Sequence, residues 1–96
     1  MTTLRIDPGK EPVAVDISYT QIEKELHSLI HEDTIHGMVA LSGLGEGPPN
    51  ELANALFKTD EIHGPVFFLT GNYTGLSRCQ IEWLLEWAEQ HSTGNR

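Results

Sequence analysis

Hydrophobic residues recur with two different periods along this chain, and the order of these periods limits the possible fold more than any other feature. Apolar and polar residues alternate at 3–7 and 13–17, which predicts a β-hairpin closed by a turn at 7–10. Nearly continuous apolar runs at 35–41 and 66–69 predict two further buried strands. The four strands lie close in sequence, so we expect one small sheet.

Segments with helical spacing of apolar residues lie between and after these strands. A residue that can cap a helix stands at the start of each segment or directly before it. The segments are 20–30, 51–57 and 77–90. Thr20 and Glu23 have the spacing of a capping box, as do Ser77 and Gln80, and Asn50 can cap the middle helix. We expect residues 31–33 to end the first helix.

Strands and helices are therefore mixed along a chain of 96 residues, which is enough for one domain. The sequence predicts an α+β fold, with a mostly antiparallel sheet of about four strands and two to three helices on one face. We place this domain at 1–91 and expect the polar tail at 92–96 to be disordered.

The charge of the chain limits the classes of partner. Fourteen acidic and six basic residues give a net charge of −8, which repels nucleic acids and membrane surfaces and attracts basic proteins. The single cysteine, Cys79, excludes an internal disulfide and fits a reducing compartment. With no apolar leader and no run long enough to span a membrane, we expect a cytoplasmic protein, in the host cytoplasm if it is phage-encoded.

The last helical segment carries two tryptophans outside its predicted inward stripe. At about 100° per residue, the inward stripe comprises Ile81, Leu84, Leu85 and Ala88. Trp83 and Trp87 lie beside this stripe, and the remaining face holds Glu82, Glu86 and Glu89. Two interpretations follow: the tryptophans pack under a neighbouring element, or they form an interface with another protein or a second copy of the chain.

A small-ligand or nucleotide site is the alternative function. The triplet Ile-His-Gly occurs twice, so His36 and His63 would lie close together if their strands are neighbours. The glycine-rich loop before Asn50, which includes Gly45, could complete such a site. However, this loop lacks the glycine spacing of a dinucleotide motif and the lysine of a P-loop, and Glu46 would repel phosphate.

Metal chemistry is a third possibility. His27 and His31 are four residues apart and would share a helix face, as zinc ligands can. Ser28 stands where a zincin has its catalytic glutamate, so we interpret the pair as solvated histidines and expect no metal and no cofactor. Cys79 has no histidine close in sequence to act as its base, which argues against a nucleophile.

Several short segments resemble a family of small uncharacterised proteins of bacteriophages and actinobacteria, a domain-of-unknown-function family. The matching segments are 6–8, 35–41, 49–56, 62–66 and 75–77. Residues 32–34 depart from the family pattern, which has a glycine pair ahead of the strand. The resemblance supplies no catalytic residues and implies a phage setting, in which small acidic proteins often bind and disable host or defence proteins.

These observations together predict a non-enzymatic, phage-type accessory protein that binds a host or defence-system protein, with inhibition of that protein as a further expectation. The residues expected to carry binding are Trp83, Trp87, Glu82, Glu86 and Glu89. A homodimer through the last helix is a second possible use of the same residues.

Overall fold

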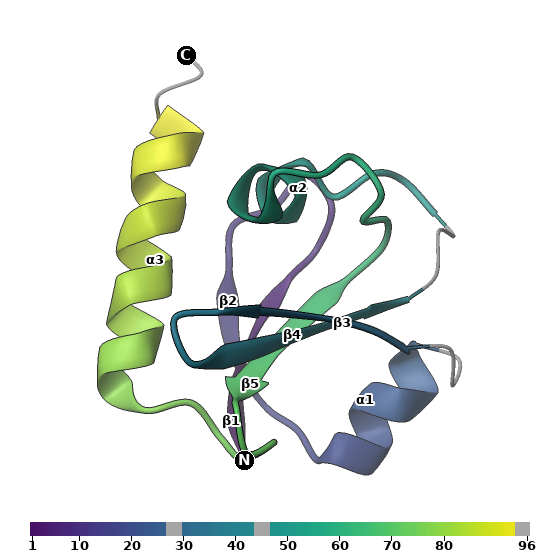
Figure 1. The fold of residues 1–96 in the computed structure, drawn as a ribbon, viewed down its shortest axis with the longest axis vertical. Helices are drawn as coiled ribbons and strands as arrows, with labels where there is room; N and C mark the ends of the chain where they lie inside the picture. Colours follow the sequence, from purple (N-terminus) through teal and green to yellow (C-terminus); the bar gives the residue numbers. More distant parts are fainter. Residues whose placement is uncertain (27–29, 44–46, 94–96) are drawn as a thin grey trace.

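The computed structural model describes residues 1–26, 30–43 and 47–93. Within these residues the elements in chain order are β1 (Thr2–Ile6), β2 (Val13–Asp16), α1 (Tyr19–Glu25), β3 (Ile30–Ile35), β4 (Met38–Gly43), α2 (Glu51–Phe57), β5 (Val66–Thr70) and α3 (Arg78–Thr93). The strands form one sheet in the order β2-β1-β5-β4-β3, and each neighbouring pair is antiparallel (Figure 1). The α+β class and the antiparallel sheet are confirmed.

The described part of the sheet has five strands where about four were expected, because residues 30–35 form an additional strand, β3, which a tight turn joins to β4. Ile35 pairs with Met38, and the two residues between them, His36 and Gly37, have φ of 48° and 73°. Positive φ at both central residues is what a type I′ hairpin turn requires. β3 therefore begins at Ile30, the last residue of the expected first helix, and includes residues 31–33, which were expected to end that helix; this part of the prediction was wrong.

The first helix also begins earlier than expected. Its capping box uses Ser18, whose Oγ accepts from the N–H of Gln21 at 3.2 Å, while the Gln21 side chain accepts from the N–H of Ser18 at 2.8 Å. Thr20 and Glu23 have the same spacing but lie inside α1. The sequence therefore contains two overlapping capping-box patterns, and the structure uses the Ser18 pattern, which directly follows β2.

Helices cover both faces of the sheet, so the expectation that all helices lie on one face was wrong (Figure 1). The larger hydrophobic cluster packs under α2 and α3 and comprises Leu4, Ile6, Met38, Ala40, Ala53, Leu56, Ile62, Val66, Phe68, Leu76 and Leu84. The smaller cluster packs under α1 and comprises Ile22, Leu26, Val39, Leu41, Phe67 and Leu69. Alternate residues of β4 and β5 enter different clusters, which explains why these strands read as continuous apolar runs.

α3 is attached to the sheet at its N-terminal end. The Leu76 N–H donates to the Thr2 carbonyl at 2.8 Å, and a Cβ on Gly75 would lie 3.0 Å from the Thr2 nitrogen, so glycine permits this close approach. The predicted capping box of Ser77 and Gln80 is confirmed, with hydrogen bonds of 2.9 and 3.3 Å. α3 extends to Thr93, so the first two residues of the expected tail are helical; residues 94–96 lie outside the described part of the chain.

Candidate functional site

The side chain of Trp83 on α3 packs against a histidine from the β3–β4 turn. The ring centroids of His36 and Trp83 are 4.3 Å apart, and the planes are tilted by 47°. The turn itself is held in place because the Gly37 carbonyl accepts from the Gly71 N–H at 2.9 Å and from Gln80 Nε2 at 3.4 Å. The turn and the first half of α3 therefore form one surface.

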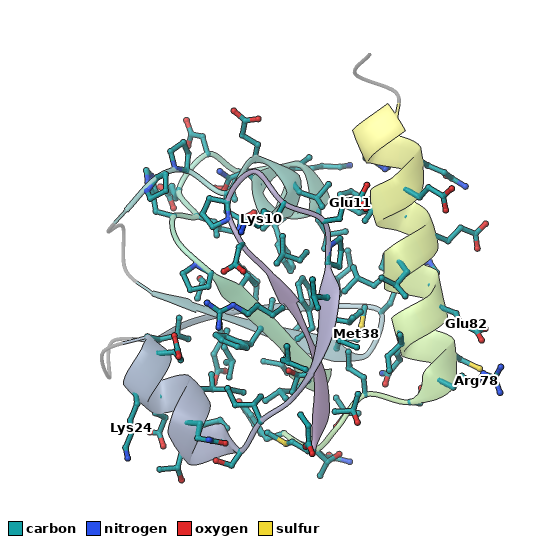
Figure 2. All side chains as sticks on the ribbon, turned by 180° about the vertical axis from the view of Figure 1, so that it is seen from behind. Lys10, Glu11, Lys24, Met38, Arg78 and Glu82 are labelled. Atoms are coloured by element: carbon teal, nitrogen blue, oxygen red, sulfur yellow. The ribbon has the colours of Figure 1, made fainter. Side chains whose placement is uncertain are left out.

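A surface cavity of about 190 Å³ lies at this junction and is lined by His36, Met38, Cys79, Gln80 and Trp83. Met38 is buried and lies between the sheet and α3 (Figure 2). Both polar ends of Gln80 are bonded within the protein, one to the Ser77 N–H and the other to the Gly37 carbonyl. Mainly an indole ring, a thioether, a thiol, an imidazole ring and methylene groups therefore face the cavity.

The second tryptophan is also stacked on a histidine. Trp87 and His91 have ring centroids 3.9 Å apart and an interplanar angle of 23°, and His91 Nδ1 lies 2.9 Å from the Trp87 carbonyl oxygen. Both tryptophans are partly buried and pack against the larger cluster. The core and interface interpretations therefore each describe part of these side chains: one side contacts the core and the remainder is accessible.

The outer face of α3 is acidic, as expected. Glu82, Glu86 and Glu89 are exposed, and Glu82 pairs with Arg78 at 3.0 Å one turn earlier. Figure 2 shows Arg78 and Glu82 projecting from the side of α3 that faces away from the sheet.

Leu85 was expected to point inward, but it is 40% exposed. The buried stripe is centred on Leu84 and Ala88, both nearly inaccessible, and it is shifted toward the tryptophans. A helix turns about 100° per residue, so this shift leaves Leu85 on the flank opposite Trp83. The inward stripe predicted from sequence was therefore wrong at this position.

The proposed histidine pair of a ligand site is not brought together. β4 and β5 are neighbours, but they are antiparallel, with Met38 opposite Thr70 and Ser42 opposite Val66. His36 precedes β4 and His63 precedes β5, so they lie toward opposite ends of the strand pair. The His63 ring is instead 2.9 Å, through Nδ1, from the Gly47 carbonyl oxygen. The shared feature of the two triplets is local: Gly37 and Gly64 have φ of 73° and 72°.

Asn50, a candidate ligand residue, has a structural role. Its side chain is fully buried, Nδ2 donates to the carbonyls of Ile6 and Gly64 at 2.9 Å each, and Oδ1 accepts from the Ala53 N–H at 3.3 Å. Both amide donors are thus committed within the protein, so the prediction of Asn50 as a ligand contact was wrong. Gly45, the other residue of that candidate site, lies outside the described residues.

The histidine pair considered for metal does not share a helix. His31 lies on β3 opposite Ser42, because the first helix ends at Glu25; His27 is outside the described residues. Across 1–26, 30–43 and 47–93, no group of three or more histidine, cysteine, aspartate or glutamate side chains is placed to hold a metal ion.

Sequence reasoning missed a polar cluster on the α1 side of the sheet. The Tyr73 hydroxyl donates to both carboxylate oxygens of Glu32, at 2.9 and 2.8 Å, and Tyr19 meets the Tyr73 ring edge-on at 5.9 Å. The hydrogen bond to Glu32 raises the pKa of Tyr73 above its usual value. The partners are far apart in sequence, and no short motif connects them.

Asn54 is a second residue that sequence reasoning missed. Its side chain bonds both backbone groups of Ile62, accepting at 2.8 Å and donating at 3.1 Å. Together with Asn50 it fixes α2 to the segment that precedes β5.

None of the helices in the described residues is both long enough and apolar enough to cross a membrane. Comparison of the chain with protein-family models, curated proteins and solved structures gives no match.

Proposed function

We propose that this protein binds another protein through a surface on α3 and the β3–β4 turn. This surface, called the α3 surface below, comprises His36, Glu82, Trp83, Glu86, Trp87 and Glu89. The observation that carries the proposal is the environment of Trp83: the indole packs on the core, stays partly accessible, and lines a cavity open at the surface. Tryptophans held in this way are the side chains that most often dominate the energetics of protein interfaces.

The pre-ordering of the aromatic side chains favours this function. Trp83 is held by His36 and by the core, and Trp87 is held by His91 and by the core. Side chains that are already fixed lose little rotamer freedom when a partner binds, so more of the contact energy appears as affinity. A rigid aromatic surface of this kind therefore suits binding better than it suits acid–base chemistry.

The charge of the surface favours a basic partner. Three glutamates occupy the outer face of α3, and the chain as a whole carries a net charge of −8. Exposed carboxylates contribute little to affinity one by one, but they steer an oppositely charged protein and speed its association at low salt. The resemblance to phage proteins favours a host or defence-system protein as this partner.

Self-association is the competing use of the same surface. Two copies would bring the glutamates of both α3 helices together, and this repulsion argues against a stable dimer at low salt. Sedimentation equilibrium over a range of protein concentrations tests this point, because a monomer at all concentrations leaves the surface free for a different protein.

A pull-down from bacterial lysate with a matched set of variants tests the proposal. Glu86→Lys changes the charge of the α3 surface, and Glu23→Lys makes the same change on α1, on the opposite face of the sheet. We expect one stoichiometric protein to be retained by the wild type and by Glu23→Lys, and lost or weakened with Glu86→Lys and with Trp83→Ala. Equal retention by all folded variants would show that binding does not use the α3 surface.

A further inference from the structure

The cavity beside Trp83 is the most specific feature of the α3 surface, and its size and chemistry indicate what it binds. Building on the proposed function, we infer that this cavity is an anchor site that takes one apolar side chain of the partner, in a segment where lysine or arginine flanks that side chain. The lining residues are His36, Met38, Cys79, Gln80 and Trp83.

The volume excludes the larger classes of ligand. Pockets for drug-sized molecules and cofactors usually enclose roughly 300–1,000 Å³, whereas this cavity measures about 190 Å³. A nucleotide or a flavin would not fit, but a single leucine, methionine or phenylalanine side chain would. The size therefore matches one residue of a protein.

The lining selects an apolar side chain over a polar one. The wall of the cavity is almost entirely apolar, and the Gln80 amide that lines it is already bonded to Ser77 and Gly37. A polar side chain placed here would lose its water and gain little in return. Thioethers and thiols also contact aliphatic and aromatic groups favourably.

Charge at the rim determines the residues that flank the anchor. Glu82 lies three residues after Cys79, and Glu86 lies three residues after Trp83, so each carboxylate is next to a lining residue on the helix surface. Glu82 forms an ion pair with Arg78, whereas the exposed Glu86 carboxylate has no ion pair among the described residues. Lysine or arginine on either side of the apolar anchor would be attracted to this rim, and glutamate would be repelled.

Cys79 gives a direct test, because its exposed thiol is at the cavity and is the only cysteine of the chain. Four hexapeptides form the probe set: after an N-terminal cysteine, each has a leucine or a serine between two pairs of lysines or two pairs of glutamates. Each peptide carries an N-terminal cysteine as its mixed disulfide with mercaptoethanol. The Cys79 thiolate attacks the peptide sulfur, the peptide becomes disulfide-linked to Cys79, and mercaptoethanol leaves as the free thiol. Excess mercaptoethanol keeps the exchange at equilibrium, and mass spectrometry measures the labelled fraction.

With either flank, we expect leucine peptides to label Cys79 about tenfold more strongly than serine peptides, as partial burial of one leucine side chain would give. Lysine flanks should label more than glutamate flanks at low salt, and this difference should shrink at high salt. Trp83→Ala should bring the ratio of leucine to serine labelling close to one. His36→Asn should lower the same ratio without disturbing the turn, because asparagine tolerates positive φ. Leu85→Ala, on the other flank of α3, should leave it unchanged.

A ratio near one in the folded wild type would overturn the inference, even if the pull-down finds a partner at the α3 surface. Labelling that falls as the protein concentration rises would also overturn it, because a second copy of the chain would then cover the cavity. Conversely, a strong leucine preference without a captured partner would contradict the proposed function while leaving the anchor chemistry intact.

Discussion

His36 of the β3–β4 turn and Trp83 of α3 stack with their ring centroids 4.3 Å apart, and this contact joins the edge of the sheet to the longest helix of the described chain. The left-handed turn presents the imidazole, and the core holds the indole from its other side. The candidate surface is therefore built from two segments far apart in sequence. Its stability and its binding properties can be tested separately.

Trp83→Ala should lower the free energy of unfolding by about 2 kcal/mol, less than a fully buried tryptophan would cost because Trp83 is only partly buried. Leu85→Ala, on the same helix but 40% exposed, should change it by no more than about 0.5 kcal/mol. Urea denaturation followed by circular dichroism measures both values. Equal losses for the two variants would mean that Trp83 has no special packing role.

Asn50→Asp separates two roles of one side chain. Aspartate caps a helix as well as asparagine does, so capping alone predicts little change. However, aspartate cannot donate to the carbonyls of Ile6 and Gly64, and we expect a loss of about 3 kcal/mol from the unpaired buried groups. The urea midpoints of the wild type and Asn50→Asp measure this. Near-equal midpoints would show that these two hydrogen bonds contribute nothing.

Local signals predicted much of the fold. The hairpin of β1 and β2, the apolar strand β5, the Asn50 cap of α2 and the Ser77 capping box all depend on residues close together in sequence. The β3–β4 hairpin was not predicted from local signals, because Leu26 and Ile30 fit a helical stripe and the Ile35–Gly37 segment fits a continuous strand. Only long-range pairing with β5 decides between these alternatives.

The candidate site was predictable only in part. The period of α3 placed the glutamates outward and marked the two tryptophans, because a helix repeats regularly. The cavity also needs His36 and Met38, which the folding of the sheet places beside Trp83. No spacing rule in the sequence connects those residues, and for the same reason the contact of Tyr73 with Glu32 was missed.

Tyr73→Phe should alter the dependence of stability on pH in the alkaline range. The pKa of Tyr73 is raised in the folded state by its hydrogen bond to Glu32, so the neutral hydroxyl stabilises the fold at pH values below the usual tyrosine pKa of 10.0. That contribution is lost as the pH rises through the folded-state pKa. The wild type should therefore be more stable than Tyr73→Phe at neutral pH, and the difference should shrink above pH 10.

Urea midpoints at neutral pH and at several alkaline pH values measure this difference. Glu32→Gln removes the carboxylate that raises the pKa of Tyr73. Like Tyr73→Phe, it should therefore make the loss of stability at alkaline pH smaller than in the wild type. A constant difference between the wild type and Tyr73→Phe at all pH values would contradict the role assigned to this hydrogen bond.

Gly75→Ala should destabilise the attachment of α3. The added methyl group would lie 3.0 Å from the Thr2 nitrogen and 3.2 Å from its carbonyl oxygen, so β1 or the linker must move, at a cost of about 1–3 kcal/mol. Gly71→Ala is the matched control, because its methyl group would meet the Gly37 carbonyl oxygen at an ordinary 3.5 Å. Thermal unfolding of both variants distinguishes them, and equal melting temperatures would show that the Gly75 contact is easily relieved.

The most direct test of the central claim blocks the α3 surface without altering its residues. The Cys79 thiol of the wild type is conjugated to a bulky maleimide, and the same reagent is placed on α1 by Thr20→Cys in a Cys79→Ser background. The affinity of each conjugate for the captured partner is then measured by calorimetry. We predict that the Cys79 conjugate loses binding while the Thr20→Cys conjugate retains it. Full binding by both conjugates would contradict the claim that the α3 surface is where this protein meets its partner.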